Sequence, residues 1–371
     1  MHAIVRFIPY ALVMRTGWAR HAWVVAVVIT AAACSPVPDV SRHSPPPSSD
    51  TPPAPHAART VEPPITAPAV LPPQPYEDAT DVLPPAPSRT GRGTMHVVDG
   101  RAVVGDGTRQ SCTAAALGRA VARGGTVTFD CGGPARIVLT EPLRVCAAGG
   151  CAPGEPSVAR VRIEGGDAIT LVGAGAGRLI EARGCTASEG GCTGAPVPHL
   201  VLSRLVLEGG AAPRVVEDDE RLTGGGAVAM DGGRLTLDAV TFAGNTCSDP
   251  EASAGGAVLA RDMVAPVRVR GAAFLGNSCG LGGALAVVDA PLRLRATTVV
   301  DNTATVAGGG LLLRSPDADV ELSMAMVVGN TAPRGAAIEH ETAEGALTVR
   351  DSRVEAGPLE PDAIAVRSLT D

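Results

Sequence analysis

A repeat aligned on asparagines constrains this chain more than any other feature of the sequence. Each full copy ends at an asparagine and is mostly apolar at ten, eight, five and three residues before it. The full copies end at Asn245, Asn277, Asn302 and Asn330. Weaker copies end at Gly210 and Gly357, and the six end points are 35, 32, 25, 28 and 27 residues apart. A fixed pattern with variable spacers predicts stacked structural units whose insertions form loops.

The spacing within one copy predicts the path of the chain. Positions ten and eight alternate as they do in a strand. A flat strand would point positions eight and five, such as Leu237 and Val240, to opposite faces, so the chain must bend if both point inward. A glycine signal such as Gly255–Val258 lies between the copies and predicts another strand. Each copy therefore predicts two short strands joined by a corner, a turn and a third strand, which is one coil of a parallel β-helix.

Stacked coils would place equivalent residues of successive copies directly above one another, because neighbouring strands lie about 4.8 Å apart. We expect continuous columns of aliphatic side chains inside the stack. The four repeat asparagines should form an amide ladder in a turn, each amide bonding to the next. Phe242 and Phe274 should stack inside. Helices are disfavoured, because the apolar runs are short and the glycines would weaken a helix.

Two motifs of the repeat are similar to those of a known family. The Gly-Gly-Ala-Val type of signal and the Phe-x-x-Asn motifs at 242–245 and 274–277 resemble the repeats of chlamydial polymorphic outer-membrane proteins. More broadly, the pattern resembles bacterial right-handed parallel β-helix repeat proteins of the pectin-lyase-like fold. The resemblance covers residues 95–371 and implies an all-β, right-handed parallel β-helix, a single-stranded solenoid. It implies a surface or adhesin-like role and transfers no catalytic residue, because one fold hosts many functions.

The N-terminus has the pattern of a lipoprotein signal peptide over residues 1–33. An apolar run, Trp23–Ala33, follows basic residues and ends in three alanines directly before Cys34. This order predicts export, with Cys34 as the lipidated first residue of the mature chain. Ordinary cleavage and an uncleaved anchor are the alternatives, and Met14 is an alternative start. Because Ser35 stands where an aspartate would signal inner-membrane retention, we expect an outer-membrane lipoprotein at the cell surface or periplasmic face.

Residues 34–94 are predicted to be a disordered linker, dominated by Pro, Ala, Ser and Thr. Such a segment cannot form a core and tends to extend. At about 3.1 Å per residue in polyproline form it would span well over ~100 Å. It is either a stalk that crosses an envelope layer or a featureless tether. Both alternatives place the folded domain, residues 95–371, away from the lipid.

A short helix is predicted ahead of the first coil. Ser111 or Thr113 can cap its N-terminus, and Gly124 can end it. Because a β-helix has open strand edges at both ends, this helix is the expected cap of the N-terminal end. At the other end, residues 358–371 contain two prolines and acidic residues that would discourage edge pairing, but they contain no clear capping element.

Eight cysteines remain besides Cys34, and an even number in an exported chain suggests disulfides. Cys247 and Cys279 each follow a repeat asparagine by two residues, so stacked coils would place their Cα atoms about 5 Å apart, within disulfide range. The other candidate pairs are Cys112 with Cys131, Cys146 with Cys151, and Cys185 with Cys192. The first would tie the capping helix to the first coil, and the others bracket glycine-containing loops. Metal binding is the alternative, although the spacings and the absence of nearby histidines argue against it.

The outward positions of the repeat carry a cluster of arginines. They are Arg268, Arg270, Arg293 and Arg295, flanked by Asp238 and Glu321. Like charges at this spacing repel unless they are paired. One interpretation is a solvated face on which Asp238 pairs with Arg270 and Arg293 pairs with Glu321. The other is an anion-binding patch for acidic polysaccharide or lipopolysaccharide.

Composition argues against several function classes. A formal net charge of −7, no lysine and no basic arm with interleaved aromatics argue against nucleic-acid binding. The outward positions show no stack of carboxylates of the kind that a pectin-lyase-like enzyme needs. The predicted domain has no Trp or Tyr for stacking on sugars. His199 and His340 lack a catalytic partner motif, and we expect His340, between Glu339 and Glu341, at the rim. No metal or cofactor is expected.

Three functions follow from these features. The preferred hypothesis is a non-enzymatic, lipid-anchored envelope protein whose β-helix binds another cell surface or an envelope or extracellular polysaccharide. The alternative is a polysaccharide lyase or hydrolase, which would need a cleft of two or three carboxylates built by loops. The third is a structural spacer without a ligand.

Overall fold

The computed structural model describes residues 93–146, 158–174, 177–184, 197–213, 222–249, 251–357 and 362–369. All of them belong to the larger of the two compact units into which the chain divides, residues 80–371. The predicted signal peptide 1–33, the predicted lipidation residue Cys34 and the predicted linker up to residue 92 lie outside the described residues.

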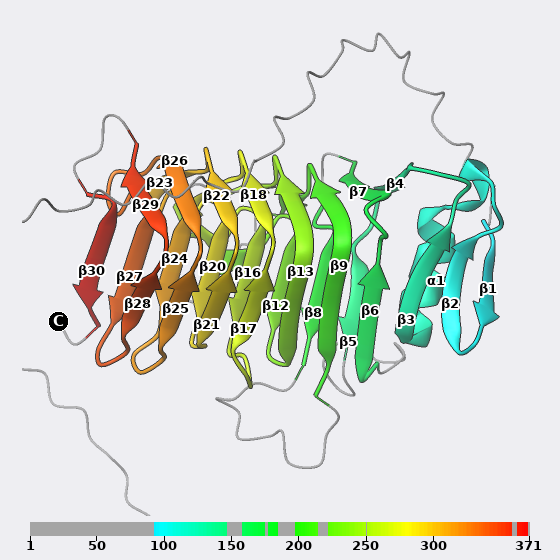
Figure 1. Cartoon of the computed structure of the whole chain (residues 1–371), viewed down its shortest axis with the longest axis horizontal. Helices are drawn as coiled ribbons and strands as arrows, with labels where there is room; N and C mark the ends of the chain where they lie inside the picture. Colours follow the sequence, from blue (N-terminus) through cyan, green and yellow to red (C-terminus); the bar gives the residue numbers. More distant parts are fainter. Residues whose placement is uncertain are drawn as a thin grey trace, which may run out of the picture. The chain divides into compact units, whose positions relative to one another are not determined.

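Within these ranges the chain is mostly β-structure, arranged in three sheets with a single α-helix (Figure 1). Sheet A consists of β1 (Met95–Val98), β2 (Arg101–Gly105), β3 (Gly125–Asp130), β4 (Ala135–Leu139), β6 (Arg160–Glu164), β7 (Ile169–Gly173), β9 (His199–Glu208), β13 (Arg234–Ala243), β17 (Val267–Arg270), β18 (Ala273–Leu275), β21 (Leu292–Arg295), β22 (Thr298–Val300), β25 (Val320–Ser323), β26 (Met326–Asn330), β28 (Leu347–Arg350) and β29 (Arg353–Ala356). Sheet B consists of β5 (Leu143–Cys146), β8 (Ile180–Arg183), β12 (Val228–Asp231), β16 (Val258–Arg261), β20 (Leu285–Val288), β24 (Leu311–Arg314), β27 (Ile338–Thr342) and β30 (Ile364–Ser368). Sheet C consists of β10 (Ala211–Ala212), β11 (Thr223–Gly224), β14 (Thr246–Cys247), β15 (Ser253–Ala254), β19 (Ser278–Leu281) and β23 (Thr303–Ala307).

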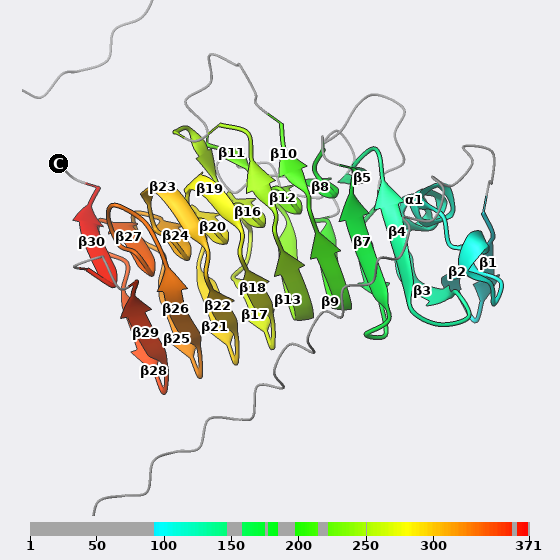
Figure 2. The ribbon, with the colours of Figure 1, turned by 90° about the horizontal axis from the view of Figure 1, so that it is seen from above.

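One coil passes through all three sheets. β17 and β18 lie in sheet A, β19 in sheet C and β20 in sheet B, before β21 begins the next coil in sheet A. Strands of successive coils pair in parallel, whereas β1 and β2 form an antiparallel hairpin. Figure 2 shows equivalent strands of successive coils side by side in chain order. The prediction of an all-β, solenoid-like fold is confirmed.

A strand follows Asn245, Asn277 and Asn302, and it was not predicted, because a turn was expected there. Ser278 N donates to Asn245 O, and Thr303 N donates to Asn277 O, each at 2.9 Å. These bonds continue the stacking of the coils beyond the asparagine. The segment after these three asparagines therefore extends as a strand of sheet C, and their coils have four strands where three were predicted. Asn330 instead ends β26 and is followed by an isolated bridge at Thr331.

The predicted corner within sheet A is a left-handed backbone position. The residue six positions before each repeat end point has a φ between 47° and 60° in all six copies. These residues are Arg204, Ala239, Gly271, Ala296, Met324 and Asp351. A left-handed residue interrupts the alternation of the strand, so the side chains on both sides of it can point inward. Leu237 and Val240 are fully buried as a result, which confirms the predicted bend.

The core is a set of side-chain columns that run through the coils. The residue eight positions before the end point is at most 1% exposed in five successive copies. These residues are Leu202, Leu237, Val269, Leu294 and Leu322. Phe242 and Phe274 belong to another column, and their rings stack with centroids 4.8 Å apart, as predicted. The columns keep the coils in register, because a slip by one residue would turn the apolar side chains outward.

The four repeat asparagines form the predicted amide ladder where the chain leaves sheet A. The side-chain amides of Asn245, Asn277 and Asn302 each donate to Oδ1 of the next asparagine at 2.9 Å. The same Oδ1 atoms also accept from the backbone N–H of the preceding asparagine at 2.9–3.0 Å. All four asparagines, including Asn330, are at most 1% exposed. The ladder therefore supplies hydrogen bonds that water cannot supply at this depth.

The core at the N-terminal end of the stack is covered by α1 (Ala114–Arg123), as predicted, but sheet A continues past β3 in the β1–β2 hairpin, which was not predicted. Thr113 Oγ1 accepts from Ala116 N at 3.2 Å, and Gly124 ends the helix with a φ of 76°. A 3₁₀ turn, Arg109–Ser111, precedes the helix. The helix buries four residues in the core: Ala116, Leu117, Ala120 and Val121. A disulfide from Cys112 to Cys131, with Cα atoms 5.7 Å apart, ties the start of the helix to the end of β3.

Candidate functional site

The outer face of sheet A presents the four arginines identified in the sequence. Arg268 and Arg270 on β17 are in register with Arg293 and Arg295 on β21. All four are exposed, while the residues between them face the core. Neighbouring strands of a sheet are about 4.8 Å apart. The backbone positions of the four arginines therefore form a two-by-two grid, and the side chains leave it on the same face of sheet A.

Of the two ion pairs predicted to neutralise this grid, one forms and one does not. Arg270 Nε lies 3.5 Å from Asp238 Oδ1, which confirms the first predicted ion pair. Arg293 and Glu321 are in register, but no ion pair joins them in the part of the chain that the structure describes, so the second predicted pair is wrong. Register fixes only the backbone positions, and an exposed ion pair contributes too little energy to hold two long side chains together in every case. Within the described ranges, Arg268, Arg293 and Arg295 make no ion pair.

Further arginines extend the positive charge toward the N-terminal coils. Arg160 and Arg234 lie on either side of His199 in the strand register, and both are exposed. His199 Nε2 lies 3.0 Å from Thr236 Oγ1. Burial lowers the pKa of His199, and the charges of Arg160, Arg234 and Arg268 lower it further. Arg160 and Arg234 therefore add positive charge beside the grid, in a chain whose net charge is negative.

A second group of charges, on the outer face of sheet B, was missed by the sequence reasoning. Glu339 and Glu341 on β27 share this face, and their side chains are at most 2% exposed. Arg334 Nε bonds Glu339 Oε1 at 2.7 Å, and Arg334 Nη2 lies 3.8 Å from Glu341 Oε1. Arg314 also pairs with Glu341. Burial raises the pKa of Glu339, although the hydrogen bond from Arg334 acts in the opposite direction.

The position of these two glutamates could have been found from the alternation after the last glycine signal. Ile338 belongs to the core cluster, so Glu339 and Glu341 must point to the other face of the strand. The sequence prediction compared charged residues only at the outward positions of the repeat, which lie in sheet A, and so it missed the glutamates on sheet B. The burial of the carboxylates could not have been predicted, because it depends on the path of the segment that carries Arg334.

His340 does not lie at the rim, where its charged neighbours had suggested that it would. It is in register with Leu313 and Val366, points into the stack and is 3% exposed. A residue between two outward glutamates on a strand must face inward, so the rim prediction was wrong. Burial lowers the pKa of His340, and the neutral imidazole is a member of the core.

We expect the buried His340 to make the folded state less stable as pH falls. The unfolded chain binds a proton near the ordinary histidine pKa of about 6.5, whereas the folded chain binds it only at a lower pH. Stability is therefore lost as pH drops through the unfolded pKa, and the loss levels off below the folded pKa. Urea unfolding between pH 7.5 and 5 should show a weaker pH dependence for His340→Leu than for the unchanged protein. His96→Leu, on the exposed β1, is the matched control; equal slopes for all three proteins would contradict the assignment.

A hollow of about 170 Å³ opens on the outer face of sheet B near its middle strands. Its charged lining includes Arg183, Glu181, Asp231 and Arg261. Most of these charges are already paired: Arg261 Nη2 lies 2.8 Å from Asp231 Oδ2, and Arg183 Nη2 lies 3.0 Å from Glu181 Oε1. The hollow therefore offers a ligand fewer uncompensated charges than the arginine grid on sheet A does.

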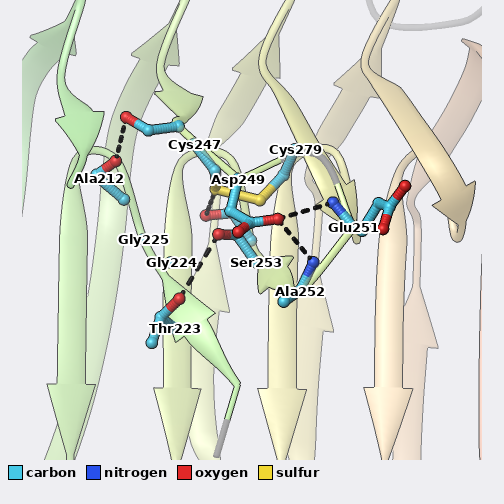
Figure 3. Close-up of a disulfide and its surroundings, with 12 residues drawn as sticks. Ala212, Thr223, Gly224, Gly225, Cys247, Asp249, Glu251, Ala252, Ser253 and Cys279 are labelled. Carbon is cyan, nitrogen blue, oxygen red and sulfur yellow. Dashed lines mark hydrogen bonds between the residues drawn. A yellow bond between two sulfur atoms is a disulfide. The ribbon is translucent and has the colours of Figure 1, made fainter. Parts of the chain in front are cut away.

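The described cysteines form disulfides. Cys247 and Cys279 are joined as the repeat predicted, with Cα atoms 4.9 Å apart, and link β14 to β19 (Figure 3). Beside this cross-link, Asp249 Oδ1 accepts from two successive backbone N–H groups at 3.0 Å, which closes the following loop. Cys146 is also disulfide-bonded, whereas the candidate cysteines Cys151, Cys185 and Cys192 lie outside the described residues. No group of three His, Cys, Asp or Glu side chains in the described ranges could hold a metal ion.

Comparison with known proteins assigns no family to the chain. No protein-family model matches it, and no significant match exists among the curated proteins or the solved structures. The described part of the chain contains no helix with both the length and the apolar character needed to cross a membrane.

Proposed function

We propose that this protein is an exported, lipid-anchored envelope protein whose right-handed parallel β-helix binds an anionic glycan through the outer face of sheet A. The right-handed coil is supported by the parallel pairing of successive coils, because parallel crossovers are right-handed in about 98% of cases. The resemblance to the chlamydial repeats supports a surface or adhesin-like role. The lipid anchor rests on the signal-peptide pattern that ends at Cys34.

The observation that carries the binding proposal is the set of stacked arginines without ion pairs. Arg268, Arg293 and Arg295 project from adjacent strands with no carboxylate within ion-pair distance in the described ranges. Uncompensated like charges at this spacing repel one another, so the apo protein gains nothing from their arrangement. An anionic polymer would relieve the repulsion and make charge-assisted hydrogen bonds to the guanidinium groups. A flat face without aromatic side chains suits recognition by charge and not by stacking on sugar rings.

Replacing Arg268, Arg293 and Arg295 together by serine is expected to weaken binding of an anionic glycan by about tenfold or more, since ~1.4 kcal/mol corresponds to a tenfold change. The affinity of the unchanged protein should also fall with added salt, because these side chains are exposed. The measurement is equilibrium binding of the full chain to two probes. Polygalacturonate presents carboxylates and lipopolysaccharide presents phosphates, so the two probes distinguish the sources of negative charge.

The matched control is a triple serine variant with the same loss of charge at ion-paired arginines. Arg136, Arg183 and Arg204 serve for this purpose, since each pairs with a glutamate. The control should bind both probes nearly as well as the unchanged protein. If neither probe binds the unchanged protein, or if the sheet A variant binds equally well, the role of a structural spacer replaces the binding proposal.

The proposed location is tested by protease treatment of intact cells, followed by detection of the domain 95–371. Loss of the domain from intact cells places it on the surface and favours adhesion or recognition. Protection until the outer membrane is breached places it in the periplasm, and the ligand is then sought among periplasmic polysaccharides. Release of the chain by detergent alone, together with loss of membrane association in Cys34→Ser, is the outcome expected of a lipid anchor.

One observation favours a polysaccharide lyase or hydrolase as the second candidate. Glu339 and Glu341 lie within reach of a single guanidinium group, Arg334, on the outer face of sheet B. A pair of carboxylates on one face is the usual equipment of glycoside hydrolysis. Both are buried and paired with arginines, however, so a polymer would meet them only after a rearrangement. We expect no release of reducing ends or unsaturated products from polygalacturonate, and Glu341→Gln should lower the stability; cleavage that Glu341→Gln abolishes would establish the enzyme.

A further inference from the structure

The last coil that the structure describes leaves three strand edges without a neighbour among the described strands. β28 and β30 are the terminal strands of sheets A and B, and β29 pairs only with β26. Within the described residues, no strand pairs with the far side of any of the three (Figure 1). Such edges carry unpaired N–H and C=O groups, which are a template for pairing with another chain.

The core itself is open at this end. Val349 and Val366 continue the columns of Leu322 and His340, but their exposures are 37% and 68%. Ile364, which stacks on the fully buried Ile338, is 37% exposed. These side chains point inward as in every other coil, and no coil of the described residues lies over them. A contact that covers this end would bury apolar surface and pair strand edges at the same time.

At the opposite end of the described residues the core is closed, although the outer edge of β1 has no neighbour there. There α1 covers the core with side chains that are at most 1% exposed, such as Leu117 and Val121. Head-to-tail addition could pair β1 with the C-terminal coil, but it would place the open core against a core that is already covered. The only arrangement that joins open core to open core brings two C-terminal coils together, and such a contact between identical surfaces has two-fold symmetry and closes as a dimer.

The charged residues of β29 indicate that this strand lies at the symmetry axis. Arg353 and Glu355 flank Val354 on the outer face, with side chains 66% and 49% exposed, and bond each other at 2.6 Å. In an antiparallel pair of β29 edges centred on Val354, Arg353 of each copy would face Glu355 of the other. We propose that a second copy of this chain docks on the C-terminal coil, with the two β29 edges paired antiparallel about Val354. The other exposed apolar side chains of the coil are covered in the same contact.

A disulfide placed on the axis tests this dimer. Residues opposite each other in an antiparallel pair have Cα atoms about 4.5–5.5 Å apart, within disulfide range. The full chain with Val354→Cys should form a reducible species of twice the monomer mass in intact cells. Thr348→Cys, on the neighbouring strand of the same coil, is off the axis and should give far less. Equal yields from both positions would indicate random collision and overturn the proposal, as would absence of the dimer.

Charge reversal tests the register with the same disulfide. In the Val354→Cys background, Arg353→Glu places four carboxylates at the axis and should lower the yield of the dimer. Adding Glu355→Arg restores complementary charges in swapped positions and should restore the yield. Failure of the double reversal to recover the dimer would overturn the proposed pairing. If the thiol introduced by Val354→Cys is protected from maleimide without forming a dimer, another molecule covers the coil, which also overturns the docking of a second copy.

Discussion

Replacing Asn302 by alanine is expected to lower the free energy of unfolding by about 3–5 kcal/mol, because several buried polar groups lose their partners at once. Asn302 Oδ1 accepts from both the backbone N–H and the side-chain amide of Asn277. Its own amide donates to Asn330 Oδ1 and to two backbone carbonyl groups. Alanine leaves these groups unpaired at a depth where exposure is at most 1%. Urea denaturation of the full chain measures the loss.

The adjacent residue supplies the control for this prediction. Thr303 is exposed and makes its stacking bond through the backbone, which alanine retains. Thr303→Ala should therefore cost under about 1 kcal/mol, within the range of strand propensity. If Asn302→Ala lowers the free energy of unfolding no more than Thr303→Ala does, the ladder does not contribute to stability.

Replacing Phe274 by alanine is expected to cost about 3–5 kcal/mol, as large-to-small changes of a buried phenylalanine usually do. Phe274 is fully buried, and its ring stacks on that of Phe242 with an angle of 10° between the planes. The stacked coils above and below hold the backbone in register, so the cavity cannot collapse easily. Unfolding of the full chain in urea, followed by far-UV circular dichroism, measures the effect.

Leu275→Ala is the matched control for the aromatic column. Leu275 is the next residue of β18 and points to solvent with 39% exposure. Its truncation should change the stability by about 1 kcal/mol or less. Similar losses of stability in Phe274→Ala and Leu275→Ala would show that packing of the aromatic column contributes little to the stability of this coil.

Much of the fold could be predicted because a stacked repeat converts spacing into three-dimensional position. The corner at Ala239, the asparagine ladder and the cross-link between Cys247 and Cys279 all follow from aligning equivalent residues. The strand after Asn245, Asn277 and Asn302 could not be predicted in this way, because the three segments share no apolar pattern. Its hydrogen bonds come from the neighbouring coil and not from its own residues.

The candidate site was less predictable, because side-chain contacts on an exposed face depend on rotamers and solvent. The alignment placed Arg293 beside Glu321 correctly, yet the pair does not form. Conversely, the alternation along β27 contained the positions of Glu339 and Glu341, but their burial depends on Arg334, which lies outside the repeat pattern. Register is a property of the backbone and is readable from the sequence, whereas the state of a long charged side chain is not.

The places where the coils differ in length determine where this fold can change. The ten residues before each repeat asparagine are constant in number, whereas Asn245 is ten residues from the next glycine signal and Asn277 only five. An odd number of residues added in the constant stretch would reverse inward and outward faces, whereas the extra residues of the longer coil lie between β14 and β15, outside the strands. Loops of one coil can therefore change in length and sequence, and so alter the protein surface, while the core columns and the asparagine ladder that stabilise the stack stay the same.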